Sequence, residues 1–564
     1  MNKKKLTVLV MITLLFSSFT FGQVLKIQPY DKDPRSLIAI IRADTTANPG
    51  ILATRIYELE NGGIYLSTEI LTLVKNKTLR LRAPDGPKPI IYLHPTGTGS
   101  NPQNPPGNFV VLNGGHIEFY NIAISGIFEP NWSNINNMQG GLINTTGVGS
   151  RIKIDKCLLT NVNGQPIRTG SGSNLVKVTN SIFANMGSLT TSNFGAGKAI
   201  DLREVSCDTL YLVNNTFVNY QDRPVRHLNL AAGNTVTGIL NVCIIDHNTF
   251  VNGMGFHGVL SLGNVGKRVQ ITNNLFFDAY ALGQDSLDTE RSVEYNNTGE
   301  KYANGNNKMP MIFSAPSDTT VYDIQNNYIG ISPLGQSWFA AHPRHSPGEP
   351  ITQFIRNRLG AKAANAFKDL TNFAFVRTPR LMTNLMDYYV SPTGGNYTKN
   401  KPGYNYLIHD MDRRVYKYYT DTLNCTYSIQ HPAFTGAQKG FPVGDLNWFP
   451  TQKADWLAQG GTSVQTREGI PTEFTLEQNY PNPFNPTTNI RFSLPKSSVV
   501  SLVIYNALGQ KVATLIEGKE FNAGNYNYTW NGKDLNGNNL SSGIYFYQLN
   551  TKDFSVTKKM MLLK

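Results

Sequence analysis

The chain has 564 residues, including 50 glycines; only 16% of its residues are charged, and its formal net charge is +13. This composition is typical of a turn-rich β protein with several domains, rather than of a helical or disordered chain. The positive charge comes with no basic run and no nucleic-acid motif, so we expect an anionic polysaccharide rather than nucleic acid as a partner.

Residues 1–22 have the pattern of a secretory signal peptide. Lysines occupy positions 3–5, an apolar run covers residues 6–16, and Gly22 precedes a plausible cleavage point. The alternative is an uncleaved anchor, but the run is short for a membrane span and no later run reaches about 18 apolar residues. We therefore expect export into the periplasm and no transmembrane segment in the mature chain.

Residues 23–330 read as one repetitive domain, whose first part, up to about residue 112, supplies the first coils and an N-terminal cap. From residue 117 to 328 the chain repeats an alternating strand, a bend rich in asparagine, and an apolar or aromatic residue. The second bend position falls at residues 157, 181, 215, 248, 274 and 327. A strand recurring at such a period is typical of stacked coils.

Stacked coils explain this pattern because one coil cannot bury its inward side chains alone. Neighbouring coils pair their backbones at about 4.8 Å, and their inward residues form a continuous core. Asparagine tolerates left-handed backbone geometry at a bend and can hydrogen-bond its equivalents above and below. The sequence therefore predicts an all-β chain with a right-handed parallel β-helix; the alternatives are a β-sandwich or a propeller.

The four cysteines are Cys157, Cys207, Cys243 and Cys425. Export permits disulfides, and four cysteines allow three pairings. They have no metal-ligand spacing, so buried free thiols are an equal alternative.

Each coil has a second strand, and these strands predict a column of charged side chains. Inward residues are aligned at Ile143, Ile167, Ile200, Val225 and Val259. Because neighbouring strand residues face opposite sides, the outward column is then Asn144, Arg168, Asp201, Arg226 and Leu260. We predict that Arg168, Asp201 and Arg226 stack on three successive coils.

The rest of the chain does not follow the coil repeat. Residues 331–450 contain a helical stretch near 351–370 and Pro-Gly-Asn loops, and we expect them to form the C-terminal cap and lateral loops of the β-helix. Residues 451–470 read as a linker. Residues 471–564 alternate in short strands and turns, which predicts a small immunoglobulin-like β-sandwich.

The last 90 or so residues closely resemble the type A C-terminal sorting domain of the type IX secretion system of Bacteroidota. The resemblance rests on residues 480–484, 530–532 and 542–545 and on the basic-apolar end 558–564. It implies handling by the type IX machinery through residues 471–564, and then release or attachment at the cell surface. A sorting domain directs transport and does not reveal the activity.

The body is similar to secreted, pectate-lyase-like β-helix proteins of Bacteroidota, through its Asn-aromatic coils and the ending at residues 440–448. The departures are clear: Arg223-Pro224-Val225-Arg226 is shorter than the Arg-x-Pro-x-x-Arg of pectate lyases, and Ile244-Ile245-Asp246-His247 lacks the tryptophan of their Trp-Ile-Asp-His motif. His247 fills a bend position held by asparagine in other coils, which favours a structural role. These departures put the family's catalytic roles in doubt.

A lyase of this kind neutralises a uronate carboxylate, often through Ca²⁺, and abstracts the neighbouring proton with a base. The charged residues around the column supply candidates for each role. The catalytic candidates are Arg226, Arg223 and Lys198; the substrate-binding candidates are Arg168, Arg203 and His227; the Ca²⁺ candidates are Asp201 and Glu204. Lysine is the easier base, because guanidinium almost never loses its proton.

Two functions are compatible with the sequence. One is a polysaccharide lyase acting by β-elimination on a uronate-containing glycan. The other is a non-catalytic glycan-binding or adhesive surface protein, whose charged column is an ordinary salt-bridge ladder on a solvated face. Glycoside hydrolysis ranks lower, because it needs two positioned carboxylates and no convincing outward pair is present.

Overall fold

The computed structural model describes residues 24–95, 105–128, 138–188, 195–227, 238–398, 401, 403, 405, 423–461, 474–479, 481–521, 524–535 and 537–563. The predicted signal peptide, Tyr480 and the linker beyond residue 461 lie outside these residues. The chain divides into two compact units, residues 1–461 and 462–564. No helix within the described residues is both long enough and apolar enough to cross a membrane.

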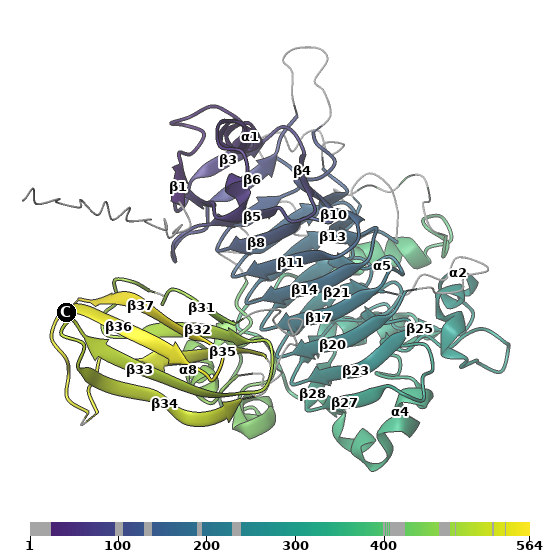
Figure 1. Cartoon of the computed structure of the whole chain (residues 1–564). Helices are drawn as coiled ribbons and strands as arrows, with labels where there is room; N and C mark the ends of the chain where they lie inside the picture. The colour runs from purple at the N-terminus through teal and green to yellow at the C-terminus, as the bar shows by residue number, and fades with distance from the viewer. Residues whose placement is uncertain are drawn as a thin grey trace, which may run out of the picture. The chain divides into compact units, whose positions relative to one another are not determined.

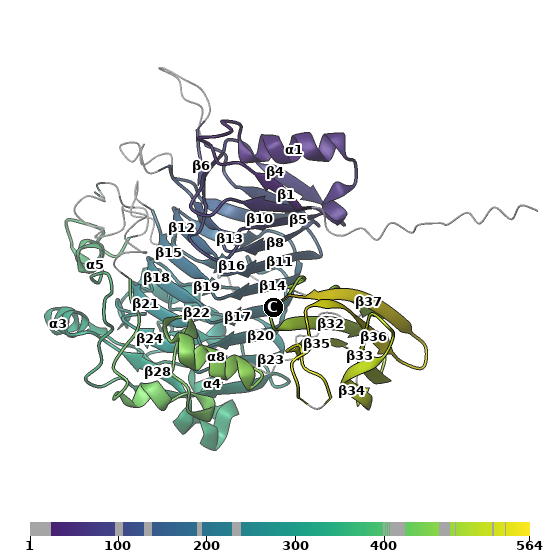
Figure 2. The same cartoon turned by 90° about the vertical axis from the view of Figure 1, so that its left-hand side faces the viewer.

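The first unit is the predicted parallel β-helix, built of three long parallel sheets whose strands stack coil upon coil (Figures 1 and 2). Sheet 1 contains β1 (Val24–Ile27), β2 (Ile56–Leu59), β5 (Thr78–Arg82), β8 (His116–Tyr120), β11 (Ser150–Asp155), β14 (Ser173–Thr179), β17 (Cys207–Val213), β20 (Leu240–Asp246), β23 (Val265–Thr272) and β27 (Val321–Gln325). Sheet 2 contains β3 (Ile64–Ser67), β6 (Ile90–Leu93), β9 (Ala123–Ser125), β12 (Leu158–Val162), β15 (Ile182–Met186), β18 (Thr216–Tyr220), β21 (Thr249–Gly253), β24 (Leu275–Phe277), β28 (Asn327–Gly330) and β30 (Phe367–Asp369). Sheet 3 contains β4 (Leu71–Val74), β7 (Val110–Asn113), β10 (Gly141–Gly147), β13 (Gln165–Thr169), β16 (Ile200–Asp201), β19 (Val225–Arg226), β22 (Leu260–Ser261) and β26 (Ile312–Phe313).

The bend between sheets 1 and 2 shows why asparagine recurs in the sequence. Its first position is left-handed, with φ of 55° at Asn214 and 59° at Asn273, and His247 occupies the same place with φ of 51°. Its second position forms a buried ladder, in which Asn248 Oδ1 accepts from Asn215 Nδ2 (2.9 Å). The predicted bend role of His247 is therefore confirmed.

Inside the coils, identical apolar side chains lie above one another. The rings of Phe183, Phe217, Phe250 and Phe276 stack in register, with centroids 4.8–5.1 Å apart. All four cysteines are buried free thiols. Such stacking joins the coils into one hydrophobic core.

Helices cover the two ends of the stack. At one end α1 (Leu37–Ala47) buries Leu37, Ile38 and Ile41. At the other, α4 (Gln353–Leu359) and the 3₁₀ helix η5 (Gly360–Asn365) pack on β27 (Figure 1). Capping of this kind protects the terminal coils from pairing with another chain.

Shorter elements lie outside the coils. They are η1 (Ile51–Ala53), β25 (Gln284–Asp285), α2 (Thr289–Ser292), η4 (Val293–Thr298), α3 (Pro333–Ala341), β29 (His345–Ser346), α5 (Thr383–Val390), η6 (Pro432–Thr435), η7 (Gln438–Gly440), η8 (Leu446–Trp448) and α8 (Pro450–Ala458). Helix α8 occupies the start of the stretch predicted as a linker.

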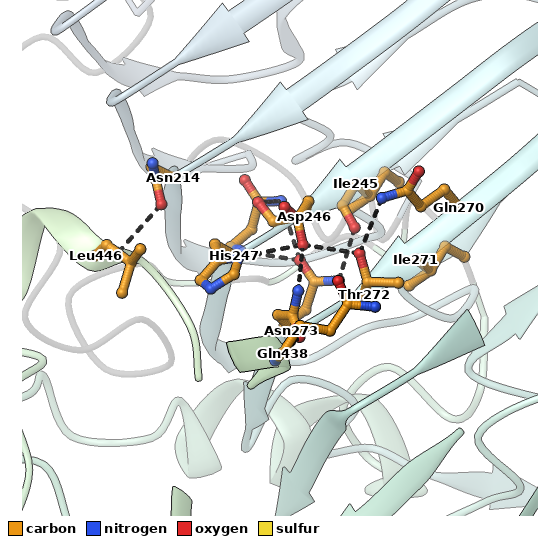
Figure 3. A network of polar contacts seen from close by, with 12 residues as sticks. Asn214, Ile245, Asp246, His247, Gln270, Ile271, Thr272, Asn273, Gln438 and Leu446 are labelled. Atoms are coloured by element: carbon orange, nitrogen blue, oxygen red, sulfur yellow. Dashed lines mark hydrogen bonds and ion pairs between the residues drawn. The ribbon is translucent and has the colours of Figure 1, made fainter. Parts of the chain in front are cut away.

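Residues 438–456, which we call the clasp, run back along the bend between sheets 1 and 2. Gln438 N donates to Asn273 Oδ1 (2.9 Å), and further along Lys453 Nζ donates to Asn180 Oδ1 (2.7 Å). Figure 3 shows Gln438 beside Asn273 and Leu446 beside Asn214. The clasp therefore joins coils that are distant from it in sequence.

The second unit is a small antiparallel sandwich. One sheet contains β31 (Thr475–Leu476), β32 (Thr488–Leu494) and β35 (Gly524–Trp530); the other contains β34 (Lys511–Phe521), β33 (Ser498–Asn506), β36 (Gly543–Asn550) and β37 (Ser555–Leu562). Phe484, Ile490, Trp530 and Tyr547 are among the residues of its core.

Candidate functional site

Sheet 3 brings most of the predicted column together. Asn144 pairs with Arg168, Arg168 with Asp201, and Asp201 with Arg226. The next step differs from the prediction, because Arg226 pairs with Ser261 and Leu260 lies in the inward row beside Val225. The left-handed Gly258 (φ 88°) ends a tight turn just before this strand. The length of this turn sets the register of β22, and strand periodicity in the sequence does not determine turn length.

Arg226 is enclosed rather than solvated. Its side chain is 9% exposed; Nε lies 3.1 Å from Asp201 Oδ1, and Nη2 donates to Glu204 Oε1 at 3.3 Å. Burial lowers the pKa of Arg226 and raises that of Glu204. The three groups thus form a desolvated ion-pair cluster, in contrast to a ladder on a solvated face.

A second group of charges centres on Asp222. Its Oδ2 lies 2.5 Å from Lys198 Nζ, and its Oδ1 lies 2.9 Å from His257 Nδ1. Burial acts to raise the pKa of Asp222, but Lys198, His257 and Arg223 together hold it well below its usual range. Burial lowers the pKa of Lys198 to about 8.

Glu294 of η4 closes this group from outside the coil. Its Oε2 accepts from Arg223 Nη2 (3.2 Å), and its Oε1 lies 3.8 Å from His257 Nε2. Although burial opposes ionisation, His257 and Arg223 lower the pKa of Glu294 to about 2. Sequence reasoning missed His257 and Glu294; Glu294 belongs to no repeat, and nothing in its neighbourhood signals that it folds back onto Arg223.

Two predicted substrate-binding residues lie beside the cluster of Asp201, Glu204 and Arg226: Arg203 N donates to Asp201 Oδ1 (3.2 Å), and His227 follows Arg226. His227 is fully buried, with Nδ1 2.8 Å from the Leu262 carbonyl oxygen and Nε2 3.0 Å from that of Val205. Arg203 is exposed and left-handed, with φ of 47°. The ring of His227 is held by the backbone, which is the geometry of a structural side chain.

The predicted Ca²⁺ ligands do not fit that ion. Asp201 and Glu204 both face the guanidinium of Arg226, and within the described ranges no three acidic, imidazole or thiol groups gather as a metal site. Ca²⁺ takes about six to eight oxygens, and two carboxylates already paired with a cation do not supply them.

A cavity of about 380 Å³ opens on the flank of sheet 3, next to the charged groups. Its lining comes from four successive coils and consists of Gly107, Asn108, Gly140, Gly141, Asn144, Asn163, Gly164, Gln165, Arg168, Gly195 and Ala196. Four of these side chains are amides, and Arg168 is the one charged group in this lining. The volume lies in the lower part of the range for small-molecule sites, about 300–1,000 Å³.

Arg168 and Asn144 have unused hydrogen-bonding capacity here. Arg168 is half-buried, and the structure gives its guanidinium no ion pair or hydrogen bond with any described residue. Oδ1 of Asn144, its neighbour in the column, is buried and has no hydrogen-bond partner among the residues that the structure describes. The cavity therefore offers a planar cation and an orphaned acceptor to a ligand.

Comparison with known proteins identifies the C-terminal unit. Residues 478–563 match the secretion system C-terminal sorting domain, as the sequence resemblance predicted. No curated protein matches the chain. The chain therefore carries a type IX sorting domain and is a secreted or cell-surface protein.

Two solved structures share local similarity with the chain. Dimeric latent PorU from Porphyromonas gingivalis is 19% identical over 16% of this chain and 9% of its own, with a TM-score of 0.14. PorZ, a surface component of the type IX secretion system of the same organism, is 18% identical over 17% of this chain and 13% of its own, with a TM-score of 0.13. The chain thus spans a small part of either protein.

Proposed function

We propose that the β-helix of this secreted protein binds an anionic, uronate-containing glycan in the cavity on sheet 3. The observation that carries the proposal is the guanidinium of Arg168, which lies among amide side chains and has no partner within the described part of the chain. The export signal of the C-terminal unit supports it, because extracellular polysaccharide is then within reach.

The chemistry of the lining matches such a ligand. A guanidinium offers two parallel N–H donors to a carboxylate, and such charge-assisted pairs are about twice as strong as neutral hydrogen bonds. Amides both donate and accept, so they suit sugar hydroxyls. Burial removes part of the water around a cation, and a cation without a partner gains no hydrogen bond in exchange. A bound carboxylate would supply that hydrogen bond.

The test is calorimetric titration of the mature full chain with polygalacturonate, alginate and a neutral polysaccharide. We expect the two polyuronates to bind and Arg168→Gln to lose about tenfold or more in affinity. Arg151→Gln on sheet 1, another half-buried arginine, is the matched control and should bind as the parent does. The proposal would be contradicted if the Arg168 variant bound as tightly as the parent, or if no polyuronate bound at all.

A second candidate is β-elimination, and one observation favours it. Lys198 has a pKa of about 8 and lies two residues after Ala196, which lines the cavity. Its Nζ, however, is paired with Asp222, and the residue is only 2% exposed. A buried and paired amine is poorly placed to take a proton from a glycan, so glycan binding is the favoured function.

The unsaturated product of elimination absorbs in the ultraviolet, so activity can be followed directly on a panel of polyuronates. A signal lost in Lys198→Met and retained in Lys267→Met would establish the lyase, provided that thermal unfolding shows the Lys198 variant to be folded at the assay temperature. Repeating the assay with Ca²⁺ and with chelator tests the metal. A flat trace across the panel would leave binding alone.

A further inference from the structure

Lys453 of α8 lies between two asparagine side chains. Its Nζ donates to Asn447 Oδ1 at 2.5 Å and to Asn180 Oδ1 at 2.7 Å. Asn447 belongs to the clasp, six residues before the lysine, whereas Asn180 lies at a left-handed bend of the coils. The lysine is half-buried, and burial lowers its pKa. A lower pKa increases the share of neutral amine, which is the nucleophilic form.

The side chain of Asn447 is fixed by contacts at both ends of its amide. Nδ2 donates to Asp445 Oδ1 at 2.5 Å and to Asn214 O at 2.7 Å, while Oδ1 accepts from Lys453 Nζ. Two groups that are already held together react much faster than free groups, because little rotational or translational freedom is left to lose. The amide is therefore held with its carbonyl group toward the amine.

Asp445 supplies a buried carboxyl group beside the amide nitrogen of Asn447. The residue is 2% exposed, its Oδ2 accepts from Thr216 Oγ1 at 2.7 Å, and burial raises its pKa. Asp155, which accepts from Nδ2 of Asn180 at 2.6 Å, is only half-buried. Burial favours the protonated form of a carboxyl group, and that form can act as a general acid. Of the two asparagines, Asn447 thus has the better placed acid.

We propose that Lys453 and Asn447 form an intramolecular isopeptide bond, with Asp445 transferring the proton. Nζ attacks Cγ of Asn447, and the bond from Cγ to Nδ2 breaks. The proton that Nζ gives up passes to Nδ2 through the carboxyl group of Asp445, so that Nδ2 leaves as ammonia. One amide replaces another, and the step needs no oxidant, reductant or other co-reactant.

The bond locks the turn between the clasp and helix α8. The 3₁₀ helix η8 in this turn carries Trp448, whose Nε1 donates to Thr216 Oγ1 of β18 at 2.9 Å. A ring closed between residues 447 and 453 restricts the conformations that the turn can reach when it opens, so the clasp stays on the coils. The inference is independent of glycan binding on sheet 3.

The test is peptide mapping of the denatured, mature full chain by mass spectrometry. Trypsin does not cut after a lysine whose amine is acylated, so we expect a peptide that runs through Lys453 and is lighter than its sequence by one ammonia molecule. After cleavage with chymotrypsin at Trp448 or Phe449, the two pieces should stay joined. The map is needed besides the intact mass, because an N-terminal Gln23 also loses ammonia when it cyclises.

Two variants and a control locate the reacting groups. Lys453→Arg keeps the charge but has no reactive amine, and Asp445→Asn removes the group that transfers the proton, so neither should carry the bond. Lys439→Arg is the matched control, because Lys439 lies in the same clasp and its Nζ donates to Gln459 O. This control should keep the bond. Thermal unfolding of each variant shows that it is folded.

The outcomes decide each part of the proposal. The bond in the parent and in Lys439→Arg, together with its absence in Lys453→Arg, supports it. Cleavage by trypsin after Lys453 in the parent would overturn it, and so would a bond from Lys453 to Asn180. Complete formation of the bond in Asp445→Asn would overturn the role of that carboxyl group.

Discussion

Nζ of Lys198 lies 2.5 Å from Oδ2 of Asp222, and both side chains are almost completely buried. Lys198 follows Ala196 of the cavity lining by two residues, and Asp222 also contacts His257. Desolvation makes such a pair sensitive to the loss of one partner, because the remaining charge is left buried.

The Lys198–Asp222 pair predicts strong non-additivity. Lys198→Met should lower the free energy of unfolding by about 3–5 kcal/mol, because Asp222 then loses its closest cation. The double variant Lys198→Met with Asp222→Asn should be less destabilised than the sum of the two single changes. Urea unfolding of the four proteins of the cycle measures this; additive losses would contradict the pairing.

Asp278 predicts a pH-dependent stability. Burial raises its pKa to about 6, and its Oδ1 accepts from Ser332 N. Between about pH 4 and pH 6 the folded chain binds the proton more tightly than the unfolded chain, so stability falls as pH rises through this window and stays lower above it.

Asp278→Asn removes that penalty. Asparagine keeps the acceptor and tolerates the left-handed backbone, as Asn161, Asn185, Asn219 and Asn252 do at the matching positions. The variant should be more stable than the parent by about 3 kcal/mol at neutral pH, and equal to it below about pH 4. A constant difference at all pH values, measured by thermal unfolding, would refute the assignment.

The asparagine ladder predicts a large cost for a small deletion. Oδ1 of Asn248 accepts from Asn215 N and Nδ2, and its own Nδ2 donates to Asn274 Oδ1 and Leu212 O. Asn248→Ala leaves several buried groups unsatisfied and should cost about 3 kcal/mol or more. Asn241→Ala, which removes one exposed bond to Asp208, should stay within about 0.5 kcal/mol of the parent.

The clasp predicts a local opening. Oδ2 of Asp445 accepts from Thr216 Oγ1 at 2.7 Å, and Asp445 N donates to Thr249 Oγ1 at 2.9 Å. Asp445→Ala should expose residues 438–456 to limited proteolysis while the coils stay folded. Asp455→Ala, on the exposed side of α8, is the control. Unchanged cleavage in the Asp445 variant would mean that other contacts hold the clasp.

The sorting domain predicts the location of the chain. Removal of residues 471–564 should leave the β-helix in the periplasm, because the type IX machinery would no longer recognise it. Cell fractionation of a type IX-competent host, with the full chain as control, measures this. Equal amounts outside the cell with and without the tail would contradict it.

Sequence alone was sufficient for features that the backbone requires in every coil. The left-handed bend at Asn214, His247 and Asn273 recurs because few residues tolerate positive φ, and the ladder at Asn248 recurs because a buried amide needs an equivalent above and below. Alternation in strands also placed Arg168, Asp201 and Arg226 in one column. The sorting domain was equally readable, since its marks are local.

Only the tertiary structure decided what surrounds that column. Glu294 reaches Arg223 from a segment outside the repeat, the turn at Gly258 shifted the register by one residue, and the cavity beside Arg168 is formed by four coils together. Periodicity is a property of neighbouring residues, so it fixes which way a side chain points. Whether that side chain is buried, paired or left open to a ligand depends on segments far away in sequence and on turn lengths that follow no period.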